Sequence, residues 1–100
     1  MNIQIQSIKF DADKKLVDYV ESKLSKLVKF NDEITSVEVY LRLDPNQEEG
    51  NKRVEVKILI PGDEIFVERQ ARKFEEAVDL CVDALKVTIT KNKEKSKKFN

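Results

Sequence analysis

Hydrophobic and polar residues alternate along the first stretch of the chain, residues 2–10. The alternation starts at Ile3 and shifts phase at Ile8. A period of two predicts a β-strand, because successive side chains of a strand point to opposite faces, and the phase shift predicts a bulge near Ser7. We therefore expect the chain to begin with a bulged strand.

The next stretch has the period of an amphipathic helix. Asp11 and Asp13 are candidate N-caps, because an acidic side chain there accepts hydrogen bonds from unpaired backbone N–H groups at the positive end of the helix dipole. Apolar residues then recur every three or four positions, at Leu16, Tyr19 or Val20, Leu24, Leu27 and Val28. This spacing predicts a helix of about 18 residues that ends near residues 30–31.

Three further apolar runs alternate with polar residues and predict an antiparallel meander with one buried face. Their apolar positions are Val37, Val39, Leu41 and Leu43, then Val54, Val56, Ile58 and Ile60, then Ile65 and Val67. The polar segment 44–51 is typical of a loop, and Pro61-Gly62 of a tight turn, because proline fixes φ and glycine permits positive φ. The last strand is expected at residues 64–68.

A second long helix is predicted from about Gln70 onward, where apolar residues again recur at i, i+3 and i+4. They are Phe74, Ala77, Val78, Cys81, Leu85 and Ile89. The element order is therefore β-α-β-β-β-α, and two helices with one apolar stripe each can cover one apolar sheet face. The predicted fold class is α/β (α+β), a two-layer sandwich in which a four-stranded sheet carries both helices on one face.

The composition favours a binding protein over an enzyme. The 100 residues include one cysteine, no histidine and two glycines, which excludes an internal disulfide and argues against a structural zinc site, histidine catalysis and a glycine-rich phosphate loop. No apolar run approaches the ~20 residues of a membrane span, and the first residues do not have the pattern of a secretory signal. We therefore expect a cytoplasmic protein that has no metal, cofactor or small-molecule substrate.

Charge is strongly polarised although its total is zero. Residues 86–100 contain six lysines and one acid, Glu94, for a net charge of +5, so residues 1–85 carry −5. A cationic end of this kind can bind a polyanion locally. The alternative is a solvated basic tail, since lysine is also a good and soluble helix former.

Lysines on the two predicted helices are spaced so that they share faces. Lys23 and Lys26 are three residues apart on the first helix, and Lys86 and Lys93 are seven apart on the second, with Lys91 further round. If the helices pack side by side, their ammonium groups form one cationic surface, which is what contact with several phosphates requires.

Other candidate sites are assigned structural roles. The open sheet face carries four glutamates that would repel phosphate, so we do not expect it to bind nucleic acid. Cys81 lies on an apolar stripe without a histidine to activate it, so a buried inert thiol is expected. Asp79 and Asp83 form an i, i+4 pair that we expect to be solvated. The acids of the 44–51 loop lack EF-hand spacing and are interpreted as polar loop residues.

Three segments carry a family resemblance. They are KLSKLVKF at the end of the first helix, the turn PGDEI, and FEEAVDLCVDALKVTITKNKEK in the second helix. Together with the opening IQSIKFDADKKLVDYV and the β-α-β-β-β-α order, they resemble the ribosome hibernation factors. This family includes the short hibernation-promoting factor, ribosome-associated inhibitor A and sigma-54 modulation proteins. The resemblance is to the short form, because no segment is similar to the second, dimerisation domain of long members.

The resemblance implies a translation inhibitor that binds the small ribosomal subunit in the channel used by mRNA and tRNA. Lysines of both helices would contact ribosomal RNA: Lys23, Lys26, Lys86, Lys91, Lys93 and Lys95. Residues 1–92 would form the ribosome-binding domain, and residues 93–100 a basic tail that is either disordered or an extension of the helix. The protein would act without a membrane or a small molecule and would be monomeric off the ribosome.

The chain departs from the family pattern at several positions. Ala84 and Val87 stand where members commonly have basic residues, and Asn92 stands where an aromatic residue or histidine is usual. Lys73 and Glu75 replace the Asp and Tyr of many members. One stripe of the expected basic face is therefore thinned, and Lys86 and the basic tail would compensate from neighbouring directions.

Two other functions stay open. One is a generic double-stranded-RNA-binding module, which would bind free duplex RNA as well as it binds ribosomes. The other is an acylphosphatase-like hydrolase on a related sandwich. That enzyme needs an anion-cradling loop, which neither PGDEI nor DPNQEEG provides.

Overall fold

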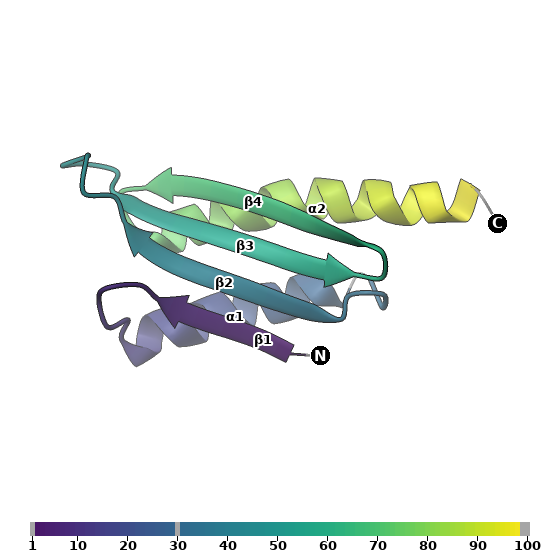
Figure 1. The fold of residues 1–100 in the computed structure, drawn as a ribbon, viewed down its shortest axis with the longest axis horizontal. Helices are drawn as coiled ribbons and strands as arrows, with labels where there is room; N and C mark the ends of the chain where they lie inside the picture. The colour runs from purple at the N-terminus through teal and green to yellow at the C-terminus, as the bar shows by residue number, and fades with distance from the viewer. Residues whose placement is uncertain (1, 30, 99–100) are drawn as a thin grey trace.

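The chain folds into one layer of strands and one layer of helices. The computed structural model describes the backbone of residues 2–29 and 31–98 and the side chains of residues 2–29 and 31–89. Its elements are β1 (Asn2–Ser7), α1 (Lys14–Val28), β2 (Ser36–Leu43), β3 (Lys52–Ile60), β4 (Asp63–Ala71) and α2 (Phe74–Lys98). Figure 1 shows both helices on one side of the sheet, running in the same direction. The predicted α/β two-layer sandwich is therefore confirmed.

The four strands form a mixed sheet in the order β1-β2-β3-β4. The pairs β2–β3 and β3–β4 are antiparallel, as the meander predicted, and β1 is parallel to β2. The parallel pair arises because α1 returns the chain to the starting end of the sheet before β2 begins. Hydrophobic spacing predicts which face of a strand is buried but not which strand lies beside it, so this order was open from sequence.

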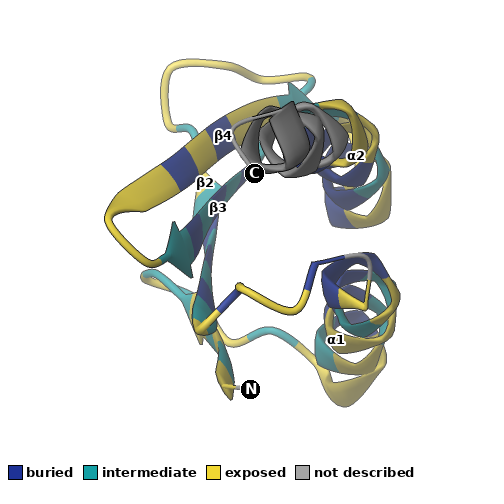
Figure 2. Cartoon of the chain, turned by 90° about the vertical axis from the view of Figure 1, so that its right-hand side faces the viewer, coloured by how far each residue is buried: buried dark blue, intermediate teal, exposed yellow. Residues whose placement is uncertain are grey.

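The core lies between the sheet and the two helices. One face of each central strand is closed to solvent, as at Val39 of β2 and Val56 of β3. The helices contribute fully buried leucines, including Leu24 of α1 and Leu85 of α2. In Figure 2 the buried residues line the space between the two layers, and exposed residues lie on their outer sides. The outer surfaces of both helices therefore do not contribute to the core.

Of the two candidate caps, Asp13 begins α1. Its carboxylate accepts a hydrogen bond of 2.8 Å from the backbone N–H of Leu16, and the helix then runs for 15 residues to Val28. This is shorter than the predicted length of about 18 residues. The chain turns after Val28, where the backbone N–H of Asn31 donates to the carbonyl of Val28 instead of continuing the helix.

The first strand is also shorter than predicted. β1 ends at Ser7 rather than at residue 10, although the N–H of Ile8 still donates to the carbonyl of Leu41 at 2.9 Å. The cause is Lys9, whose φ of 66° turns the chain away from the sheet. The predicted phase shift thus marks the end of the strand and not a bulge within it.

The boundary between β4 and α2 lies later than predicted. Gln70, where the helix was expected to start, pairs with Arg53 in the sheet, and its side-chain amide donates to Asp44 and to the carbonyl of Gly50. These bonds extend β4 to Ala71, and α2 begins at Phe74.

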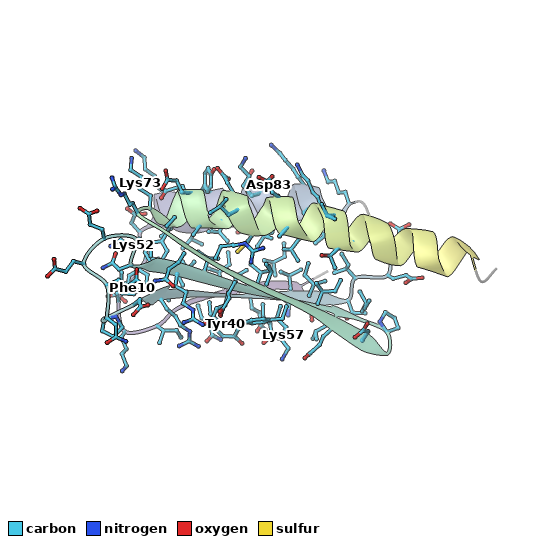
Figure 3. The ribbon with its side chains drawn as sticks, turned by 90° about the horizontal axis from the view of Figure 1, so that it is seen from above. Phe10, Tyr40, Lys52, Lys57, Lys73 and Asp83 are labelled. Atoms are coloured by element: carbon cyan, nitrogen blue, oxygen red, sulfur yellow. The ribbon has the colours of Figure 1, made fainter. Side chains whose placement is uncertain are left out.

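An aromatic contact joins the starts of the two helices. The rings of Phe10, which precedes α1, and Phe74, which opens α2, are stacked with centroids 5.2 Å apart and planes 7° apart. Figure 3 shows Phe10 at the end of the molecule where α2 begins. The two parallel helices are therefore fixed to each other at their N-terminal ends.

Replacing a buried leucine on α2 should cost far more stability than the same change at an exposed position. Leu85 is 0% exposed and Leu80 is 45% exposed. We expect Leu85→Ala to lower the free energy of unfolding by about 2–5 kcal/mol, because it leaves a cavity. Leu80→Ala should cost less than about 0.5 kcal/mol. Urea denaturation followed by circular dichroism measures both, and equal losses would contradict this assignment of the buried face.

Candidate nucleic-acid interface

The lysines predicted to bind RNA lie on both helices. Lys26 on α1 and Lys86 on α2 are exposed to solvent, and the side chain of Lys23 on α1 is 43% exposed. The three residues Lys91, Lys93 and Lys95 lie on the backbone of α2, but their side chains lie outside the described residues.

A hydrogen bond between the helices fixes their register. The hydroxyl of Tyr19 on α1 donates to Oδ1 of Asp79 on α2 at 2.7 Å. This bond, followed by burial and the nearby negative charge, raises the pKa of Tyr19 to about 12. The prediction that Asp79 is simply solvated is therefore wrong. Its partner lies 60 residues away along the chain, so no local pattern pointed to the contact.

This contact places two of the lysines at the same level. Lys26 follows Tyr19 by seven residues, and Lys86 follows Asp79 by seven. Seven residues make about two turns and advance about 10.5 Å, and the helices run in the same direction (Figure 1). Lys26 and Lys86 therefore lie at about the same level along the two helices, one turn beyond Lys23. We call Lys23, Lys26 and Lys86 the cationic patch.

Lys23 of the cationic patch is already paired. The ammonium nitrogen of Lys23 lies 3.6 Å from Oδ1 of Asp79, the oxygen that also accepts the Tyr19 hydroxyl. The same nitrogen lies 5.6 Å from the centre of the Tyr19 ring, within the range of a cation–π contact. Lys26, by contrast, makes no ion pair with another described residue.

The outer surface of α2 changes sign along its length. Its first turns carry the acids Glu75, Glu76, Asp79 and Asp83, and Lys86 follows them. Figure 3 shows Asp83 pointing away from the sheet, on the outer side of the helix. A phosphate chain would thus be repelled from the first half of the helix and attracted to the region from Lys86 onward.

A second group of cations lies where the helices begin. Lys9, Arg42 and Arg53 line a cleft of about 370 Å³. Both guanidinium groups are already paired, since Glu55 lies 3.1 Å from Nε of Arg42 and 3.1 Å from Nε of Arg53, and Glu68 contacts the other side of Arg53. Carboxylates thus cancel most of the positive charge here, and we do not include this cleft in the interface.

The open sheet face is also neutralised internally. Tyr40 and Lys57 point away from the helices in Figure 3. The Tyr40 hydroxyl donates to Glu38 at 2.7 Å, and this hydrogen bond raises the pKa of Tyr40. The ammonium nitrogen of Lys57 lies 3.4 Å from a carboxylate oxygen of Glu64. This arrangement supports the expectation that phosphate binds on the helical side of the molecule.

Two positions expected to be basic from the family pattern have different surroundings. Ala84 is half-buried and packs against the core, so a long side chain there would have to leave the packed surface. Val87 is 56% exposed and follows Lys86 directly. It is an apolar residue on a solvated helix surface, where a cation could be carried without disturbing the core.

Cys81 is a structural residue. It is completely buried, its Sγ lies 3.6 Å from the carbonyl oxygen of Val54, and burial raises its pKa to about 11. The thiol therefore stays protonated near neutral pH, as the inert role predicted. Among the described residues no three potential ligands gather into a metal site, and no helix in that part of the chain is long and apolar enough to span a membrane.

Nearly the whole chain is similar to proteins of one family. The family model described as "Sigma 54 modulation protein / S30EA ribosomal protein" matches residues 3–97. A ribosome hibernation promoting factor of Azotobacter vinelandii is 32% identical over 95 residues, which cover 95% of this chain and 85% of that protein.

Two solved structures have the same fold. A ribosomal subunit interface protein from Coxiella burnetii superposes with a TM-score of 0.83 at 23% identity, over 94% of this chain and 99% of that one. The N-terminal domain of Thermus thermophilus Protein Y has a TM-score of 0.76 at 28% identity, over 91% and 98% of the two chains. The two-layer arrangement is thus shared with proteins whose sequences have diverged widely.

The titration of Tyr19 tests the contact between the helices. In a Tyr40→Phe protein, the ultraviolet absorbance of phenolate reports Tyr19 alone, and its midpoint should lie near pH 12 rather than 10.0. Asp79→Asn keeps an acceptor but removes the charge, so the midpoint should fall toward 10.0. Because the pKa is raised on folding, the bond stabilises the fold fully below pH 10 and is lost as pH rises toward 12. A midpoint unchanged by Asp79→Asn would contradict the contact.

Proposed function

The chain belongs to the Sigma 54 modulation protein / S30EA ribosomal protein family, and from this premise we propose that it binds the ribosome as a hibernation factor. The family consists of ribosome hibernation factors, which are not enzymes. The proposed site is the mRNA and tRNA channel of the small subunit, contacted by Lys23, Lys26, Lys86, Lys91, Lys93 and Lys95. The folded domain would block the channel and so halt translation without any chemical step.

The alignment of Lys26 with Lys86 is the observation that carries this proposal. Two ammonium groups from different helices face solvent at the same level, and the Tyr19–Asp79 bond sets that level. Ribosomal RNA presents closely spaced phosphates, and the counterions released from them on binding supply much of the affinity. The helix α2 continues through Lys98, which lengthens the backbone available to such a contact.

We extend the proposal to the cellular location, the oligomeric state and the cofactors of the protein. It acts in the cytoplasm, as a monomer when it is off the ribosome, and needs no cofactor. The division of the chain into a domain of residues 1–92 and a basic segment of residues 93–100 stays a prediction, in which the basic segment adds phosphate contacts to those of the patch.

The alternative is a generic double-stranded-RNA-binding module, and the same patch favours it. Duplex RNA is recognised largely through its backbone shape, which a pair of basic helices could follow. The two functions differ in their preference: a hibernation factor binds small subunits far more tightly than free duplex RNA, and a generic module binds both equally.

Charge reversal on α2 tests the proposal directly. We expect Lys91→Glu/Lys93→Glu/Lys95→Glu to weaken binding to isolated small subunits by at least about tenfold, because three phosphate contacts are replaced by repulsion. The original protein, with about four to six contacts, should show a log–log salt slope near −3 to −5. Pull-down of small subunits at several salt concentrations measures both quantities.

A matched control changes the net charge equally at the other end of the helices. Lys14→Glu/Lys52→Glu/Lys73→Glu reverses three lysines near the helix starts, where Figure 3 shows Lys52 and Lys73. This protein should retain most of its binding. If both triple variants lose affinity equally, only the net charge matters and the proposed interface is wrong.

Restoring a cation at position 87 should strengthen binding. Val87 is 56% exposed beside Lys86, so Val87→Lys adds a charge without loss from the core. One further phosphate contact should make the salt slope more negative by about 0.7–0.9. The control is Leu80→Lys, an exposed position two turns earlier on the same flank of α2, among the acids. An equal gain from Leu80→Lys would contradict the placement of the interface.

A further inference from the structure

Asp79 lies where it affects the electrostatics of the cationic patch as well as the packing of the helices. A single oxygen, Oδ1, accepts the Tyr19 hydroxyl at 2.7 Å and lies 3.6 Å from the Lys23 ammonium group. The side chains of Lys23 and Asp79 are 43% and 47% exposed, so solvent, and any approaching anion, can reach both. The carboxylate therefore serves two partners on α1 at once.

Tyr19 and Lys23 interact with different properties of the Asp79 side chain. Tyr19 needs only a hydrogen-bond acceptor, which a neutral amide oxygen would also supply. Lys23 is held by charge, and that charge cancels the ammonium group that an RNA phosphate would contact. A carboxylate at this position also repels the phosphate itself, so both electrostatic effects oppose binding.

We propose that Asp79 is a specificity-determining positioning residue that withholds Lys23 from RNA until a phosphate replaces the carboxylate as its partner. The inference rests on the proposed function, because it concerns how the same helical surface binds RNA. In the unbound protein Lys23 lies against Asp79 and the Tyr19 ring, and the effective charge of the patch is reduced. RNA that places no phosphate close to Lys23 is then bound weakly. RNA that places a phosphate there replaces Asp79 as the partner of Lys23 and uses its full charge.

Position 83 supplies a matched control on the same helix. Asp83 follows Asp79 by one turn, is exposed, and makes no hydrogen bond or ion pair with another described residue. Asp79→Asn and Asp83→Asn therefore remove the same charge from neighbouring turns of α2. Only the first also releases Lys23, and its amide oxygen can still accept the Tyr19 hydroxyl and keep the helices in register.

The experiment is a double-mutant cycle measured on two probes, isolated small ribosomal subunits and a free RNA duplex of about 16 base pairs. The proteins are the original chain, Asp79→Asn, Asp83→Asn, Lys23→Gln and the Lys23→Gln/Asp79→Asn double variant. Dissociation constants come from fluorescence anisotropy at several salt concentrations, and urea denaturation checks that each variant is folded.

We expect Asp79→Asn to tighten binding about two- to fivefold, the range of an exposed ion pair, and Asp83→Asn to have less than half that effect. On the free duplex, the salt slope of the Asp79→Asn protein should become more negative by about 0.7–0.9, as for one added phosphate contact. Lys23→Gln should weaken binding more in the Asp79→Asn background than in the original chain. The gain should be larger on the free duplex than on the subunit, because the subunit already draws Lys23 away from Asp79 in the original chain.

Any of four results would overturn the inference. They are Asp79→Asn binding no tighter than Asp83→Asn, Asp79→Asn weakening binding while the protein stays folded, Lys23→Gln having the same effect in both backgrounds, or Asp79→Asn tightening binding equally on both probes. Failure of the proposed function looks different. In that case the original chain does not bind small subunits in preference to the duplex, and the cycle on the duplex still reports whether Asp79 withholds Lys23.

Discussion

Burial of one sheet face beneath two helices is the constraint from which the rest of the structure follows. The sheet can be covered only if both helices turn an apolar stripe inward, and this leaves both outer surfaces for charged residues. The β-α-β start brings α1 back across the sheet, so the two helices lie parallel rather than antiparallel. Parallel helices place their starts together, and the Tyr19–Asp79 contact then brings Lys26 of α1 and Lys86 of α2 to the same level.

Contacts between the helices then fix how their outer surfaces lie relative to each other. The stacked rings of Phe10 and Phe74 hold the helices together at one end, and the Tyr19–Asp79 bond sets their register further along. On the sheet, several charges are cancelled by ion pairs, as in the Arg42, Glu55 and Arg53 group. On the helical side Lys26 makes no ion pair with another described residue, and the Asp79 carboxylate that sets the register also limits the charge of Lys23.

Local sequence patterns predicted well which face of each helix and strand is buried. They predicted less well the residues at which these elements begin and end. Alternation identified the buried face of each strand, and helical spacing put Lys23 and Lys26 on one side of α1, because both depend only on residues a few positions apart. The start of α2 was missed because Gln70 is held in β4 by Asp44 and Gly50, which are distant in sequence. The role of Asp79 was missed for the same reason, since its partners belong to another helix.

Site-specific photocrosslinking to ribosomes would test most directly that the helices, and not the open sheet, face RNA. A photoreactive residue would replace either Lys26, on the cationic patch, or Phe66, which is 56% exposed on the opposite face of the molecule. We expect position 26 to crosslink to the RNA of the small subunit and position 66 not to. Crosslinking to that RNA through position 66 alone would contradict it.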